Sequence, residues 1–163
     1  MFPEDVEALA RAVIAAALES EMMIATAESC TGGLVAGALT AVAGSSAVLD
    51  RGFVTYSNEA KTQMLGVPMD LIIAHGAVSE PVARAMAAGA VAQSRASLAV
   101  SITGIAGPGG GSDEKPVGLV HFGAACADGV VHQEHRFGDI GREAVRLESV
   151  RVALTMLLSR LTA

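Results

Sequence analysis

The stretch A-T-A-E-S-C-T-G-G at residues 25–33 lies between two short apolar runs, Met22–Ile24 and Leu34–Leu39. An apolar run, a small-residue turn ending in two glycines and a second apolar run predict a strand that turns abruptly into a helix. A strand joined so closely to a helix favours an α/β arrangement in which the turn lies at one edge of a sheet. The turn itself is therefore the first candidate for a site.

The residue types in this turn favour ligand binding. Gly32 and Gly33 let the backbone approach a ligand closely, and free amides at the start of a helix favour negative charge. Ser29 and Cys30 lie at the edge of that field and are both candidate nucleophiles. In the alternative interpretation, Ser29 or Thr31 only caps the helix.

The remaining segments alternate between helical and strand patterns, with apolar residues at helical spacing near both ends of the chain. The order predicts an α/β fold, a three-layer α/β/α sandwich with a mixed sheet, because the hairpin forces at least one antiparallel pair. The predicted elements are a helix over 3–18, the strand at 22–24, a helix over 34–42, a strand over 48–56 with a bulge at Gly52, a helix capped by Asn58 and stopped by Gly66, a short helix over 70–74, a helix over 79–94, a strand over 98–103, a loop over 104–116, a hairpin of strands 117–126 and 130–137, and a helix over 142–161.

Composition limits the class of protein. A chain of 163 residues suits one domain, 1–163, and its net charge of -6 without a basic run argues against a nucleic-acid partner. The longest apolar runs, such as 12–18, are shorter than the roughly 18 residues of a membrane span, and an acidic start argues against a signal peptide. We therefore expect a cytoplasmic protein. Cys30 and Cys126 form no C-x-x-C pair, so neither a disulfide framework nor a metal site is expected.

A serine nucleophile needs a base, and the four histidines are poorly placed to supply one. His75 falls in a predicted loop, whereas His121, His132 and His135 fall in predicted strands, and no G-x-S-x-G surrounds Ser29. The i, i+3 spacing of His132 and His135 on a strand places their rings on opposite faces, so they are not a metal pair.

Lys61 is the alternative base. Partial burial or a nearby positive charge would lower its pKa enough for the amine to accept the serine proton. A lysine on a predicted helix is otherwise an ordinary solvated side chain. Cys30 remains a rival nucleophile, because a thiolate at a helix start is activated; the other expectation is that it packs into the core as a small apolar side chain.

The glycine-rich loop at 104–116 follows a predicted buried strand. It lacks the Lys and Ser or Thr of a nucleotide-triphosphate P-loop and does not match G-x-G-x-x-G. As a nest of backbone amides it is suited to a phosphate or carboxylate, with the hydroxyl of Thr103 beside it. The alternative is a flexible surface loop.

Five stretches together resemble the CinA C-terminal domain family, in order and over nearly the whole chain. They are T-A-E-S-C-T-G-G at 26–33, A-G-S-S at 43–46, R-G-F-V-T-Y-S-N-E-A-K at 51–61, G-A-V-S-E-P-V-A at 76–83 and S-I-T-G-I-A-G-P-G-G-G-S-D-E-K-P-V-G at 101–118. The enzymatic members of that family are nicotinamide mononucleotide amidohydrolases. The resemblance implies hydrolysis of the carboxamide to a carboxylate with release of ammonia, as a step of pyridine nucleotide recycling and without a cofactor.

The resemblance also implies roles for individual residues. It assigns the nucleophile to Ser29 and the base to Lys61 as a Ser-Lys dyad, with Tyr56 beside them to orient either group, and we expect amides near Thr31 and Gly32 to stabilise the oxyanion. The expected substrate-binding residues are Glu28, Cys30, Thr31, Gly32, Gly33, Ser45, Ser46, Thr103, Gly104, Gly107 and Arg142.

Two expectations stay open. Arg142 matches the family's G-D-R element only approximately, because this chain reads G-D-I-G-R at 138–142. The family also implies a homodimer or larger assembly, and a pyridine mononucleotide as the substrate.

The alternative function is a non-catalytic module that binds a nucleotide or a protein and is linked to competence or the DNA damage response.

Overall fold

A computed structural model describes all residues of the chain, 1–163. It contains one sheet and helices on both of its faces, so the predicted three-layer α/β/α sandwich with a mixed sheet is confirmed. The elements in chain order are α1 (Glu4–Ser20), β1 (Ile24–Glu28), α2 (Leu34–Thr40), the short 3-10 helix η1 (Ser45–Ala47), β2 (Leu49–Val54), α3 (Asn58–Leu65), α4 (Met69–His75), α5 (Glu80–Ala92), β3 (Leu98–Gly104), β4 (Leu119–Cys126), β5 (Gly129–Arg136) and α6 (Arg142–Thr162).

The five strands lie in the order β2-β1-β3-β4-β5. β1 pairs in parallel with β2 and β3, while β4 runs antiparallel to both β3 and β5. Because the three parallel strands point the same way, their carboxyl ends meet at one edge of the sheet. Ligands of α/β proteins bind at this edge.

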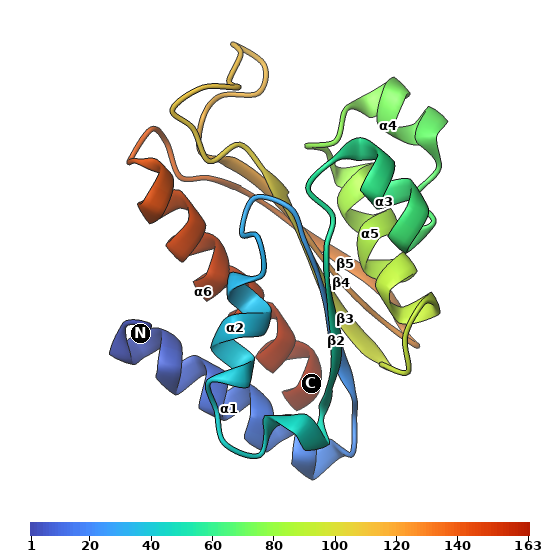
Figure 1. The fold of residues 1–163 in the computed structure, drawn as a ribbon, viewed down its shortest axis with the longest axis vertical. Coiled ribbons are helices and arrows are strands. Elements are labelled where there is room, and N and C mark those ends of the chain that lie inside the picture. Colours follow the sequence, from blue (N-terminus) through green and yellow to red (C-terminus); the bar gives the residue numbers. More distant parts are fainter.

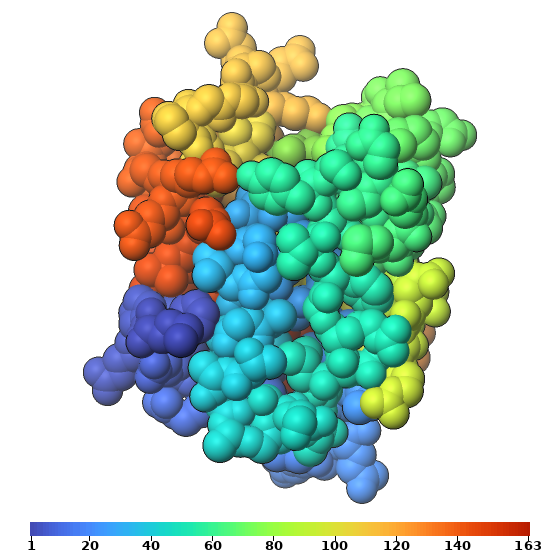
Figure 2. All heavy atoms as spheres, viewed as in Figure 1, coloured from blue at the N-terminus to red at the C-terminus, as the bar shows by residue number.

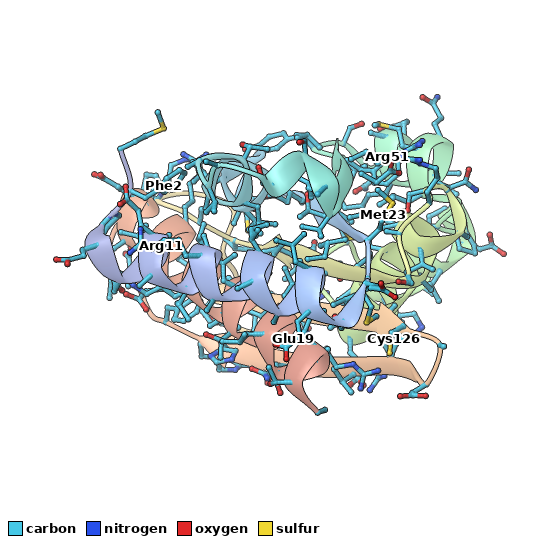
Figure 3. All side chains as sticks on the ribbon, turned by 90° about the horizontal axis from the view of Figure 1, so that it is seen from below. Phe2, Arg11, Glu19, Met23, Arg51 and Cys126 are labelled. Carbon is cyan, nitrogen blue, oxygen red and sulfur yellow. The ribbon has the colours of Figure 1, made fainter.

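The two faces of the sheet carry different helices. Figure 1 shows α1, α2 and α6 on one face and α3, α4 and α5 on the other. Seen from below, α1 lies across α6 on the first face (Figure 3). Each layer encloses its own apolar core, and β1 and β3 are buried on both faces because they separate the two cores.

Several local predictions need correction. β1 covers Ile24–Glu28, so half of the predicted turn is strand, because the small residues at 25–27 fit a strand buried on both faces. The irregularity in β2 lies at Asp50, which has no partner between the pairs Ile24–Leu49 and Ala25–Arg51, and not at Gly52. Gly52 instead allows close packing, since a Cβ there would lie 2.8 Å from Thr26 Oγ1.

Two further details differ at helix ends. The cap of α3 is Ser57, whose hydroxyl accepts a hydrogen bond from the Ala60 N–H, and Asn58 is the first helical residue. His75 is the last residue of α4 and does not lie in a loop. Gly66 stops α3 as predicted, with a left-handed backbone.

The glycine-rich loop rises from the carboxyl end of β3, as predicted, and returns to β4 at Leu119, two residues after the predicted start of that strand (Figure 1). It therefore overhangs the sheet edge at which β1, β2 and β3 end. No helix combines the length and the apolar character needed to cross a membrane.

Candidate active site

A cavity of about 270 Å³ opens at the carboxyl ends of β1, β2 and β3. It lies below the glycine-rich loop, where the start of α6 and the segment before α3 approach each other (Figure 2). Its lining residues are Ser29, Cys30, Tyr56, Asn58, Lys61, Ala77, Val78, Thr103, Gly104, Ile105, Ala106, Gly107, Gly109, Gly110 and Arg142.

Ser29 is the first residue after β1 and lies at the floor of this cavity. Its backbone N–H donates to Ile102 O at 2.9 Å, and its carbonyl accepts from Gly32 N–H at 3.0 Å. The backbone of the serine is therefore held on both sides, by β3 and by the turn itself. Only 9% of the residue is exposed, so its hydroxyl is accessible through the cavity alone.

Lys61 brings an amine to the serine from the opposite helical layer. Nζ donates to Ser29 Oγ at 3.3 Å and to the carbonyl of Thr55 at 2.8 Å. The side chain is 1% exposed, and no carboxylate lies within 4.0 Å of Nζ. Burial lowers the pKa of this amine, because it removes the water that stabilises the charged form.

The capped start of α3 explains how Lys61 reaches the cavity. Ser57 holds the first turn of the helix through its hydroxyl, and its carbonyl accepts the N–H of Lys61 at 3.2 Å. Thr55 extends the parallel pairing of β2 with β1, since its N–H donates to Glu28 O at 2.9 Å. The two segments that carry Ser29 and Lys61 are thus fixed to adjacent strands.

Glu28 is buried and does not line the cavity, contrary to the prediction that it binds substrate. Its carboxylate accepts hydrogen bonds from the Thr31 hydroxyl at 2.7 Å and from the N–H groups of Val35 and Ala36 at 2.9 and 3.0 Å. A carboxylate from the protein itself therefore occupies the anion-binding start of α2. The positive charge at the start of α2, which was predicted to attract a ligand, is therefore already neutralised by Glu28.

The turn residues Thr31, Gly32 and Gly33 also lie outside the cavity lining. The Gly32 N–H already donates to Ser29 O and is not free for an oxyanion. Between Ser29 and Gly32, the N–H groups of Cys30 and Thr31 donate to no group of the chain. Cys30 lines the cavity, so its N–H and the adjacent Thr31 N–H are the candidate oxyanion donors, whereas the Gly32 N–H expected in that role is engaged.

Cys30 packs into the core under α1, α2 and α6 and is 6% exposed. Burial raises the pKa of its thiol to about 12, so the thiol stays protonated at neutral pH. The expectation of a small apolar core side chain is confirmed, and an activated thiolate is not formed.

Tyr56 and Arg142 form one rim of the cavity. Arg142 Nη2 donates to the Tyr56 hydroxyl at 3.0 Å, and Nη1 donates to the carbonyl of Gly107 at 2.8 Å. The tyrosine is 64% exposed and forms no hydrogen bond with Ser29 or Lys61, contrary to the expectation that it orients them. The rim ties the glycine-rich loop to the segment before α3.

The sequence model described as "CinA C-terminal domain" matches residues 6–161. The chain belongs to this CinA C-terminal domain family. It is 57% identical over 136 residues to a protein of Escherichia coli (strain K12) named nicotinamide-nucleotide amidohydrolase PncC, a match that covers 82% of this chain and 81% of that relative.

Other members of the family differ in length and name. A "putative competence-damage inducible protein" of Caldicellulosiruptor bescii is 48% identical over 158 residues, or 96% of this chain, yet the chain spans only 38% of that relative. The crystal structure of "competence/damage inducible protein CihA" from Agrobacterium tumefaciens superposes with a TM-score of 0.97 at 57% identity and covers 100% of this chain and 99% of its own. An Escherichia coli CinA superfamily structure reaches a TM-score of 0.91 at 34% identity, with coverage of 98% and 94%.

Within this CinA domain, two predicted binding residues lie far from the cavity. Ser45 and Ser46 belong to η1, which leads into the amino end of β2. The cavity lies at the carboxyl end of that strand, about 17 Å away at roughly 3.3 Å per residue. Neither serine lines the cavity, so within one chain the structure does not bring them together with Ser29 and Lys61.

Thr103, Gly104 and Gly107 all line the cavity of the CinA domain. The Thr103 hydroxyl donates to Ala77 O at 2.9 Å, which fixes the wall formed by Ala77 and Val78. Sequence reasoning did not identify this wall as part of the site, although both residues lie in one of the stretches that resemble the family.

The histidines of the CinA domain lie outside the cavity lining. His132 contacts His121 at 2.9 Å on the α5 side of the sheet, whereas His135 stacks on Phe137, so their opposite faces are confirmed. No group of three or more histidine, cysteine or acidic side chains is arranged to hold a metal ion.

Proposed function

We propose that this chain hydrolyses the carboxamide of nicotinamide mononucleotide to nicotinate mononucleotide and ammonia, as a step of pyridine nucleotide recycling. The observation that carries the proposal is the 3.3 Å contact between Lys61 Nζ and Ser29 Oγ on a cavity wall. It is supported by 57% identity to a relative named nicotinamide-nucleotide amidohydrolase. The reaction needs a nucleophile, a base and a proton donor for the leaving ammonia, and two side chains can supply all three.

In the proposed reaction Ser29 Oγ attacks the carboxamide carbon while its proton passes to the neutral amine of Lys61. The carbonyl electrons move to the oxygen, which the N–H groups of Cys30 and Thr31 stabilise. Lys61 returns the proton to the amide nitrogen, the C–N bond breaks and ammonia leaves, with an ester on Ser29. Water then attacks the ester, with Lys61 again as base, and releases the carboxylate and the free serine.

We further propose that the outer part of the substrate binds at the rim. Arg142 uses two of its N–H groups within the protein and has others left for a phosphate. Thr103, Gly104, Gly107 and Tyr56 line the same opening, with Tyr56 as a contact for the ribose and not as a catalytic group. The homodimer or larger assembly stays a prediction.

Ammonia release from nicotinamide mononucleotide by the purified chain, without added metal, tests the function. Ser29→Ala removes the nucleophile and should lower kcat by about 10³-fold or more, and Lys61→Met should lower it by roughly 10²- to 10⁴-fold. The activity should rise with pH through the lowered pKa of Lys61, because only the neutral amine accepts the proton.

Cys30→Ala removes only the thiol and keeps the backbone amide, so measurable ammonia release should remain. If Cys30→Ala alone abolishes the reaction, the thiol is the nucleophile and the dyad is wrong. If the folded wild type binds the nucleotide tightly but releases no ammonia, the chain is a binding module instead.

A further inference from the structure

Arg146 lies one helical turn after Arg142 on α6 and contacts the back of the serine turn. Its Nε donates to Cys30 O at 3.0 Å and its Nη2 donates to Thr31 O at 3.3 Å. No carboxylate lies within 4.0 Å of the Arg146 side chain. In contrast, four other arginines of the chain form ion pairs of short N···O distance with acidic side chains. A planar guanidinium therefore serves here to hold two consecutive carbonyls of the backbone.

This grip sets the direction of the neighbouring amides. In a planar trans peptide the N–H points opposite to the C=O. Since Cys30 O is directed to Arg146, the Thr31 N–H is directed away from it; since Ser29 O accepts from Gly32, the Cys30 N–H is directed away from Gly32. These two N–H groups, like that of Gly33, have no acceptor in the chain.

The close approach of Arg146 restricts the turn further. A Cβ at Gly32 would lie 3.3 Å from Arg146 Nη2, and Gly32 has a positive φ of 57°. The guanidinium is thus packed directly against the peptide that follows Thr31. It does not line the cavity and is placed to act on the reaction only through the backbone.

We propose that Arg146 is a positioning residue for the oxyanion formed when Ser29 attacks. Its bond to Cys30 O directs the Thr31 N–H, and its bond to Thr31 O holds the Gly32 peptide, whose N–H in turn fixes Ser29 O and the Cys30 N–H. The inference rests on the proposed function. Hydrogen bonds that form to the oxyanion and not to the ground-state carbonyl affect kcat more than KM. Loss of Arg146 should therefore slow turnover while substrate binding is kept.

The test compares Arg146→Met and Arg146→Lys with a control on the same helix, Arg151→Met. Arg151 pairs with Asp5 and Glu148 and does not contact the turn. Arg146→Met should lower kcat by about 10- to 100-fold with KM changed less than about threefold, because small displacements of catalytic groups have effects of this size. Arg146→Lys, which can hold one carbonyl, should recover part of the loss, and Arg151→Met should retain the wild-type kcat.

The proposal is overturned if Arg146→Met raises KM at unchanged kcat, or lowers kcat no more than Arg151→Met does. Hydrogen exchange provides a second measurement that requires no activity. The Gly32 amide should exchange faster in Arg146→Met than in Arg151→Met under native conditions, and equal rates would also overturn the proposal. If the wild type releases no ammonia but the exchange difference is found, the proposed function fails while the positioning of the turn by Arg146 stands.

Discussion

The amine of Lys61 is buried without a counter-ion, so its charged form destabilises the folded state. The folded pKa is lowered below the ordinary 10.5, so the unfolded chain binds the extra proton between the two values. Wild-type stability should therefore rise with pH across that window. Replacing the amine with an apolar side chain removes the charge but leaves Thr55 O without its donor.

We accordingly predict that Lys61→Met is inactive and yet more stable than the wild type at pH 7, by roughly 1 kcal/mol. The advantage should shrink as the pH rises towards 10.5, because the folded state then no longer holds a buried charge and the unfolded amine is also losing its proton. Urea unfolding at pH 7 and pH 10 measures both effects. A variant less stable than the wild type at pH 7 would show that the hydrogen bond to Thr55 outweighs the cost of burying the charge.

At this scale the sequence predicted which two side chains meet better than it predicted their surroundings. Ser29 and Lys61 were selected as nucleophile and base, and they lie in hydrogen-bond contact across 32 positions of sequence. The burial of Glu28 against the start of α2 was missed, because a carboxylate beside a helix start can serve either a ligand or the protein. Arg146 gave no signal, since an arginine on an amphipathic helix is ordinarily solvated.

The contact between α3 and α5 controls where Lys61 lies. Gly89 of α5 meets the end of α3 so closely that a Cβ would lie 2.0 Å from Leu65 O. Alanine in a helix interior is ordinarily about 1 kcal/mol better than glycine. Here Gly89→Ala should instead destabilise the protein by roughly 1–3 kcal/mol and lower kcat by about tenfold or more, because α3 must move and it carries Lys61.

Thermal unfolding and ammonia release measure the two effects. Ala88→Gly, one position earlier on the exposed side of α5, is the matched control and should cost about 1 kcal/mol of stability with full activity. A stable and active Gly89→Ala would mean that the two helices pack independently of the site.

Element types were easier to predict from sequence than their ends. The spacing of the apolar residues identified α1 and α6 near the two ends of the chain, and the glycine-rich stretch was identified as a loop. The end of β1 was misplaced because Ala25 and Ala27 have no strand preference of their own. They are strand residues because the cores on both faces leave room only for small side chains. Tertiary packing decided that boundary.

The candidate site and one group of stabilising contacts lie at opposite ends of the molecule. The cavity lies at the carboxyl ends of the parallel strands, whereas Asp50 lies at their amino ends, the side of the molecule seen in Figure 3. Its carboxylate accepts from the Arg95 N–H at 3.0 Å and from the Arg51 side chain at 2.7 Å. These donors, the Arg95 N–H foremost, lower the pKa of Asp50 to about 2.

Asp50→Asn should therefore lower the urea midpoint at pH 7 without changing kcat. A lowered folded pKa gives stability that is present above the unfolded value of 3.8 and is lost as the pH falls through about 2. The difference between wild type and variant should thus narrow at pH 3. Asp128→Asn, exposed in the β4–β5 turn and outside any ion pair, should match the wild type at both pH values; a loss of kcat in Asp50→Asn would show that the two ends are coupled.

The occupied start of α2 has a consequence for the orientation of a ligand. With Glu28 satisfying Val35 and Ala36, the start of α2 offers no free N–H there to a dianion, while the guanidinium of Arg142 lies at the rim of the cavity. A molecule with a phosphate at one end and an uncharged group at the other is sorted by polarity, so that the uncharged end leads inward. A molecule with negative charge at both ends gains nothing from the start of α2, whichever end leads.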